Sequence, residues 1–190
     1  MTYKKIALFI ILLTVLSCSV QAQARFDIQR RSEFSIGLEG AVPINGWNYD
    51  YTNIKHAEYG AGITLKYVYN INHLLACSFQ TGYLFFPGKD IGPLKVDAGQ
   101  LPLKAGLRIM THHLYIEPQF GASAFHTKAL YNGDIKSVKT FYSPFTYALG
   151  IGTLVGKSWD IGFRYEGLDM KENSGYIALR LGYRIPLDVD

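Results

Sequence analysis

Apolar and polar residues alternate along most of the chain after its first thirty residues. In the first such stretch Phe34, Ile36 and Leu38 occupy every second position, and Glu33 and Ser35 fall between them. A period of two is typical of β-strands, whose successive side chains point to opposite faces. The pattern predicts eight strands, each of about ten residues, the length that a tilted membrane-crossing strand requires. They comprise residues 33–42, 59–69, 75–85, 100–109, 114–125, 145–155, 159–166 and 176–185.

The two faces of these strands differ in charge. One face holds no Asp, Glu, Lys or Arg in any of the eight strands. The other face holds eleven charged residues, separated by glycines and other small residues: Glu33, Glu39, Lys66, Lys104, Arg108, Glu117, Asp160, Arg164, Glu166, Arg180 and Arg184.

An eight-stranded barrel has an interior just wide enough for side chains, so it can hold the charged face if the charges pair. A soluble barrel with a ligand cavity would invert the pattern, and this chain would then expose a broad apolar belt to water. The outer solvent is therefore lipid. We predict an all-β fold, an eight-stranded antiparallel up-and-down transmembrane β-barrel, in contact with outer-membrane lipid.

The predicted connections alternate in length. Short turns fall at residues 70–73, 111–113 and 156–158, and longer connections at 44–58, 87–99, 128–144 and 168–175. Bacterial outer-membrane barrels have short periplasmic turns and long external loops, so both chain ends are expected on the periplasmic side. The four external loops, with Trp47, Tyr49, Tyr51 and Tyr131, are expected to contact an extracellular ligand or protein.

Aromatic residues gather near the strand ends in two bands. Those toward the long connections are Tyr59, Tyr83, Phe85, Phe145, Tyr147 and Tyr165, and those toward the short turns are Tyr67, Tyr69, Trp159 and Tyr183. Two such bands are typical of the aromatic girdles of membrane barrels.

The N-terminus has the features of an export signal. Lys4 and Lys5 precede a short apolar stretch, residues 6–16, and small residues follow up to Ala22 and Ala24. This order indicates a cleaved secretory signal peptide. We expect residues 1–22 to be removed, residues 23–32 to form a short N-terminal segment, and residues 33–190 to form the barrel domain. An alternative interpretation is a lipoprotein signal in which Cys18 is lipidated.

Composition narrows the functional classes further. The chain has 190 residues, 48% of them hydrophobic and 18% charged, with a net charge of +4. This argues for one ordered domain and against a nucleic-acid partner, because no run of basic residues is present. Cys77 is the only cysteine after the predicted signal, so no intramolecular disulfide is expected. No pattern predicts a metal site or another cofactor.

Several segments resemble a known family. The segment 100–108, QLPLKAGLR, is similar to a Leu-Pro-Leu motif followed by Arg in the small outer-membrane β-barrel proteins common in Bacteroidota. Residues 147–152, 161–166 and 181–185 are similar to later strands of that family. The resemblance covers residues 33–186 and implies an eight-stranded barrel of the OmpA/OmpX-like type in the outer membrane. Most members of this family have no assigned activity.

The inward charges are the strongest candidate site. An unpaired buried charge is costly, so we expect an ion-pair network that fills the lumen. Closure places the last strand beside the first, so Arg180 or Arg184 can reach Glu39, and Arg108 can reach Glu117. The candidate residues are Glu39, Lys66, Lys104, Arg108, Glu117, Arg164, Glu166, Arg180 and Arg184.

Evidence for catalysis is weak. Ser123 and His126 are the one pair that suggests a nucleophile and a base, and no carboxylate is near them in the sequence. His112 and His113 are adjacent and point to opposite faces, which fits a turn better than a metal site. We therefore expect no enzyme activity.

Three functional classes follow from these observations. The first is a monomeric structural or surface-interaction barrel, the second a narrow ion or small-solute channel, and the third a lipid-modifying enzyme. Loops on a rigid scaffold commonly carry function, which favours the first class.

Overall fold

The computed structural model describes residues 31–44, 57–88, 94–111, 114–131, 134–168 and 174–187. The predicted signal peptide, Cys18, Trp47, Tyr49 and Tyr51 lie outside these ranges. The strands are β1 (Ser32–Ile44), β2 (Gly60–Asn70), β3 (Leu75–Phe86), β4 (Leu94–Met110), β5 (Tyr115–Tyr131), β6 (Asp134–Val155), β7 (Trp159–Leu168) and β8 (Ser174–Pro186).

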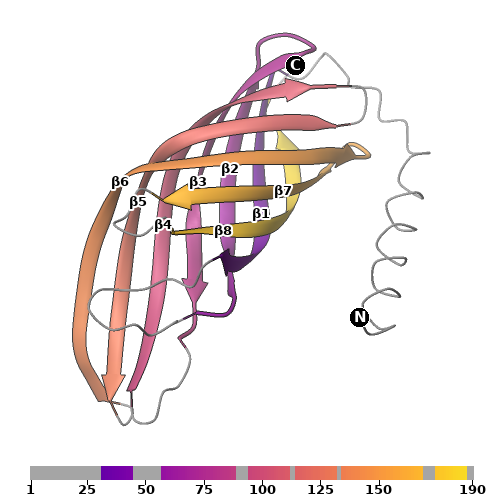
Figure 1. Ribbon diagram of the computed structural model, residues 1–190. Coiled ribbons are helices and arrows are strands. Elements are labelled where there is room, and N and C mark those ends of the chain that lie inside the picture. Colours follow the sequence, from indigo (N-terminus) through magenta and orange to yellow (C-terminus); the bar gives the residue numbers. More distant parts are fainter. Residues whose placement is uncertain are drawn as a thin grey trace, which may run out of the picture.

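The eight strands form one closed barrel (Figure 1). Each strand pairs antiparallel with the next, and β8 pairs antiparallel with β1. This confirms the predicted fold class. Among the described residues, no helix is long and apolar enough to cross a membrane.

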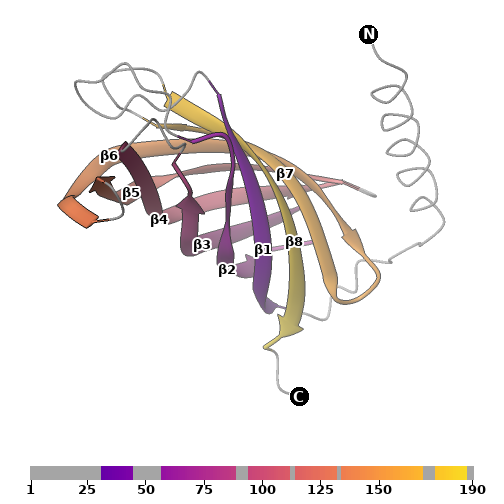
Figure 2. The same cartoon turned by 90° about the horizontal axis from the view of Figure 1, so that it is seen from below.

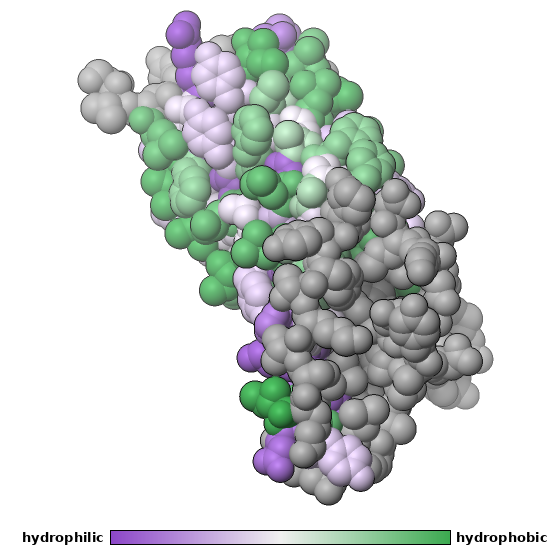
Figure 3. All heavy atoms as spheres, turned by 90° about the vertical axis from the view of Figure 1, so that its left-hand side faces the viewer, coloured by the Kyte–Doolittle hydropathy of each residue, from purple (hydrophilic) through white to green (hydrophobic). Residues whose placement is uncertain are grey.

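Alternation along each strand separates a lumen face from a lipid face. On β1, Leu38 is 67% exposed and the next residue, Glu39, is 3% exposed. Because pairing keeps outward residues opposite outward residues, as in Leu38 with Ile63 and Leu181, the outward face of the closed part of the barrel becomes apolar. Figure 3 shows apolar side chains spread over one side of the barrel.

Aromatic side chains lie near both ends of this apolar surface. A continuous row near the long-connection end joins Phe120 to Phe145, Phe145 to Tyr147, and Tyr147 to Tyr165, with ring centroids 6.1–6.4 Å apart. At the short-turn end, Trp159 and Tyr183 meet edge to face at 5.4 Å. These contacts lie at the positions that aromatic girdles occupy in membrane barrels.

Small apolar clusters lie at both ends of the lumen. A larger cluster at the long-connection end is made of Ala41, Ala57, Leu84, Phe86, Ala98, Phe125, Leu168, Tyr176 and Ala178. Met110, Tyr115 and Leu154 cluster at the short-turn end. Most of the inward charges therefore lie between two apolar clusters, whereas Glu33 and Arg184 lie at the short-turn end itself.

Strands β4, β5 and β6 extend far beyond the others on the long-connection side (Figures 1 and 2). Pairing of β6 with β7 begins at Thr146, whereas β6 itself begins at Asp134. Twelve residues of strand correspond to about 40 Å at ~3.3 Å per residue. We call the part formed by residues 94–97, 126–131 and 134–145 the protruding sheet.

The predicted long connection at residues 128–144 is wrong. In the structure β5 continues to Tyr131 and β6 begins at Asp134, and the two strands pair, with Lys128 opposite Val138 and Tyr131 opposite Asp134. Only residues 132 and 133 separate β5 from β6. Tyr131, expected in a loop, is the last residue of β5 and is 45% exposed.

Two irregularities in pairing mark the protruding sheet. Gly121 pairs with Thr146, but Ser123 pairs with Ser143, so β6 has one extra residue between them. A second shift lies between Ala129 and Leu130. A β-bulge bends a strand and increases its twist. The first bulge lies where β6 loses its neighbour β7, at the base of the protruding sheet.

Candidate functional site

All eleven inward charges are buried, none of them more than 9% exposed. Their side chains form two clusters and one separate pair. The five-charge cluster is Lys66, Arg108, Glu117, Asp160 and Arg180, and the four-charge cluster is Glu39, Lys104, Arg164 and Glu166. The separate pair is Glu33 with Arg184, joined by two hydrogen bonds of 2.6 and 3.0 Å.

Glu117 is the first centre of the five-charge cluster. Its carboxylate lies 3.0 Å from Lys66 Nζ and 2.7 Å from Arg108 Nε. Ser78 Oγ and Gln119 Nε2 also donate to it, at 2.9 and 2.6 Å. Charge-assisted bonds to one carboxylate from four directions fix its position.

Asp160 is the second centre of this cluster. Arg108 Nη2 and Arg180 Nη1 lie 3.1 and 3.3 Å from its Oδ2, and Tyr115 OH donates to Oδ1 at 2.5 Å. Arg108 thus bridges the two carboxylates, and its guanidinium also lies 3.8 Å from the centroid of the Tyr115 ring. Three cations share two carboxylates in this cluster.

The four-charge cluster is balanced. Arg164 Nη2 lies 2.6 Å from Glu39 Oε1 and 3.0 Å from Glu166 Oε2, and Lys104 pairs with the same Glu166 oxygen. Gln100 Nε2 donates to the other Glu166 oxygen at 2.8 Å. The cluster joins strands β1, β4 and β7 across the lumen.

The prediction that Arg180 or Arg184 pairs with Glu39 is wrong. Glu39 faces Arg180 in the register of β1 and β8, but it pairs with Arg164 on β7. The Arg180 side chain instead runs over Gly37 and Gly182, where a Cβ would lie within 2.8 Å of it. Glycine on both strands leaves the space that the long arginine side chain occupies.

Besides Asp160, Arg180 contacts two neutral hydroxyl groups. Its Nε donates to Thr64 Oγ1 and its Nη2 donates to Ser35 Oγ, both at 2.8 Å. By contrast, Arg108 and Glu117 form the ion pair on neighbouring strands that the sequence suggested, at 2.7 Å. Register therefore predicts the partner of Arg108 and not that of Arg180, although both side chains are arginines.

Sequence reasoning missed the uncharged members of the network. Gln80, Gln100, Gln119, Tyr115 and Tyr176 all lie on the lumen face and bond to the charged groups or to one another. Their inward places in the alternation were the available signal. They carry no charge, so the charge pattern did not predict their role.

Side chains fill the middle of the lumen. Arg108, Lys104, Gln80, Gln100, Glu117 and Glu166 are each less than 2% exposed. A continuous aqueous path would leave such central side chains accessible to water. A cavity of about 20 Å³ beside Lys66, Gln119 and Arg180 has room for a single small molecule or ion.

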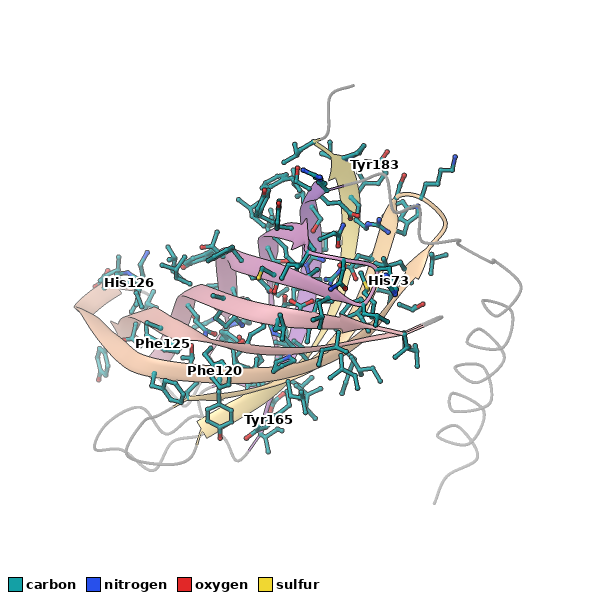
Figure 4. The ribbon with its side chains drawn as sticks, turned by 90° about the horizontal axis from the view of Figure 1, so that it is seen from above. His73, Phe120, Phe125, His126, Tyr165 and Tyr183 are labelled. Carbon is teal, nitrogen blue, oxygen red and sulfur yellow. The ribbon has the colours of Figure 1, made fainter. Side chains whose placement is uncertain are left out.

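The structure does not assemble a catalytic site from Ser123 and His126. Ser123 is 2% exposed, faces the lumen and accepts a hydrogen bond from Gln100 Nε2 at 3.1 Å. Three residues apart on one strand, the two side chains point to opposite faces. Figure 4 shows His126 on the outer part of the β5–β6 hairpin and His73 at the opposite end of the barrel.

The described residues hold no group of three or more His, Cys, Asp or Glu side chains that could bind a metal. His112 and His113 lie outside the described residues. Cys77, on β3, is a free thiol on the outward face beside Phe79, as alternation predicted.

Comparison with known families decides where this barrel resides. The family model described as outer membrane protein beta-barrel domain matches residues 10–184. The chain belongs to this family. It is an outer-membrane β-barrel protein, a class in which the long connections are external and the short turns are periplasmic.

Solved outer-membrane barrels share the fold. Ail, the attachment invasion locus protein of Yersinia pestis, superposes with a TM-score of 0.61 at 19% identity over 83% of this chain and 100% of that chain. The N-terminal β-barrel domain of Pseudomonas aeruginosa OprF gives 0.57 at 11% identity, covering 83% of this chain and 100% of that chain. Neisserial surface protein A gives 0.54 at 14% identity, covering 82% and 97%. No curated protein sequence matches the chain closely enough to indicate a relative.

Proposed function

We propose that this protein is a surface-interaction barrel, a closed membrane anchor that presents the protruding sheet to a polypeptide partner outside the cell. The observation that carries the proposal is the twelve-residue extension of β6 past its last neighbour on β7. No described residue pairs with that edge of residues 134–145. A strand edge of this length offers backbone donors and acceptors to an incoming strand.

The lumen supports an anchoring role. Paired charges in the centre and apolar clusters at both ends couple all eight strands, so the barrel can hold the external sheet in a fixed direction. The same filling argues against conduction, because a permeating ion would have to displace buried ion pairs. The lipid-modifying alternative lacks an assembled nucleophile and base among the described residues.

The related architecture of Ail is compatible with such a role. That protein is named for attachment and invasion and has been crystallised in complex with the heparin analogue sucrose octasulfate, in a structure with a TM-score of 0.58 to this chain. A barrel of this size can therefore bind a ligand. At 18% identity the likeness carries the fold, and the ligand of this chain is a separate question.

Shortening the hairpin tests the proposal. Removing residues 128–138 and joining Thr127 to Lys139, which pair across β5 and β6, through an Asn-Gly turn keeps the hairpin register. Cells that display the intact protein should adhere to at least one of immobilised fibronectin, laminin and collagen, and adhesion should fall at least tenfold for the shortened form. Equal adhesion by both forms at equal surface density, or no adhesion by either, would contradict the proposal.

A further inference from the structure

We propose that the lumen binds one small monovalent anion, of the halide class, in the cavity beside the five-charge cluster. The inference is independent of the surface role. The cavity has a volume of about 20 Å³, and its lining includes Lys66, Gln80, Gln119, Gly150, Arg164 and Arg180. A volume above that of one water-sized sphere gives room for a single occupant of about that size.

Charge gives the first argument. The four-charge cluster and the Glu33–Arg184 pair each contain equal numbers of acids and bases. The five-charge cluster contains three bases and two acids, so the unmatched positive charge of the lumen lies there. Two of the three bases, Lys66 and Arg180, line the cavity. A buried charge without a counter-charge is costly, and an anion in the cavity would neutralise it.

Unused donors give the second argument. Gln80 Nε2 and the Nε and Nη1 atoms of Arg164 have no hydrogen-bond partner among the described residues. Gln80 is 1% exposed and Arg164 is 7% exposed, and both line the cavity. Buried donors in folded proteins are nearly always satisfied, so a partner that accepts several N–H bonds is expected here.

Acceptors in the lining are fewer or already engaged. Gln119 Oε1 also has no partner among the described residues. The Glu117 carboxylate lines the cavity but already accepts from Lys66, Arg108 and Ser78. Donors and net positive charge together favour an anion over a cation. A neutral water would satisfy the hydrogen bonds and leave the charge unmatched.

Gly150 offers a way to fill the cavity without disturbing its walls. A Cβ at Gly150 would lie 3.5 Å from Glu117 O, 3.6 Å from Arg164 Cβ and 3.7 Å from Phe163 O, all ordinary contact distances. Gly150→Ala should therefore exclude the anion and keep the ion pairs. Gly40→Ala is the matched control, because Gly40 is on the lipid face and a Cβ there meets nothing within 4 Å.

Urea unfolding of the detergent-solubilised protein tests the site, with chloride exchanged for gluconate at constant ionic strength. Above the dissociation constant, each tenfold rise in chloride should raise the ratio of folded to unfolded protein about tenfold for the unaltered protein and for Gly40→Ala. Gly150→Ala should lose this dependence. Lys66→Met should lose it too, since it removes the excess charge and leaves Glu117 bonded to Arg108, Ser78 and Gln119.

Crystals of the unaltered protein soaked in bromide give a readout that does not depend on variants folding. We expect one anomalous peak in the cavity, within hydrogen-bond distance of Gln80 Nε2 or Arg164. A cavity without an anomalous peak would overturn the proposal. Chloride dependence that is equal in all four proteins would overturn it as well.

Discussion

The two halves of β6 differ in what surrounds them. Residues 146–152 pair with β5 on one side and β7 on the other, and their side chains alternate between lipid and a charged lumen. Residues 134–145 pair with β5 alone. The half of β6 in the barrel wall is thus held by two neighbouring strands and by the difference between lipid on one face and the charged lumen on the other. The outer half is fixed by one hairpin ladder, so it should tolerate changes that the inner half cannot.

Removing a central carboxylate should give the largest difference between the two regions. Glu117→Ala removes from the buried lumen the carboxylate that pairs with both Lys66 and Arg108. We expect the free energy of unfolding in urea to fall by about 3–5 kcal/mol. Asp134→Ala, an exposed acid in the protruding sheet, should change it by less than about 0.5 kcal/mol.

The double variant Glu117→Gln with Lys66→Met sharpens this result. It removes one acid and one base together, so the cluster keeps its net charge, and part of the lost stability should return. If Glu117→Ala and Asp134→Ala had equal effects, the lumen charges would be solvated and the contrast between the regions would disappear.

A charge on the outer surface should separate the regions next. Leu181 lies midway along β8 and is 47% exposed, and Ile135 in the protruding sheet is 62% exposed. Leu181→Lys should cost about 2–4 kcal/mol in lipid bilayers, because a lysine near the bilayer midplane is poorly solvated. Ile135→Lys should cost less than about 0.5 kcal/mol. Similar costs at both positions would mean that the protruding sheet is also in lipid.

Amide hydrogen exchange should show the same contrast along a single strand. Backbone amides of β5 between Ile116 and Gly121 lie in the barrel wall, and those between Thr127 and Tyr131 lie in the protruding sheet. We expect exchange at least a hundredfold faster in the second group, because the end of a three-stranded sheet outside the closed barrel can open locally, whereas the barrel wall must unfold globally. Uniform protection along β5 would show that another part of the chain covers the protruding sheet.

The smallest expected effect concerns the thiol of Cys77. It lies on the lipid-facing side of β3, so a charged, membrane-impermeant reagent should label it slowly in vesicles and rapidly after denaturation. Cysteine in place of exposed Tyr131 should react rapidly in both states. Rapid native labelling of Cys77 would place the β3 face in water.

The inner barrel could be predicted from the sequence because lipid imposes a strict pattern. A strand between lipid and a lumen must alternate, so residues such as Leu38 and Glu39 reveal both the strand and its faces. A strand in water needs no apolar face. Residues 128–144, which include Lys136, Lys139 and an Asn-Gly pair, therefore resembled a loop although they form a hairpin.

The ion pairs could be predicted only in part, for a different reason. Strand order shows which backbones are neighbours, and it brings Arg108 beside Glu117. The direction of a long side chain depends on the space around it. Gly37 and Gly182 leave the space that the Arg180 side chain occupies, and it does not pair with Glu39. Neutral partners such as Tyr115 carry no charge signal, so their role emerges only from the folded barrel.

Single-molecule conductance in planar bilayers tests most directly the central claim that this barrel is a closed anchor. With the charged lumen filled by side chains less than 2% exposed, the unaltered protein should give no stable conductance in 1 M KCl, a salt at which open porins conduct steadily. The form shortened by residues 128–138 should be equally silent, because the hairpin lies outside the barrel wall. A stable, large conductance from the unaltered protein would contradict the claim and make the channel the better account of its function.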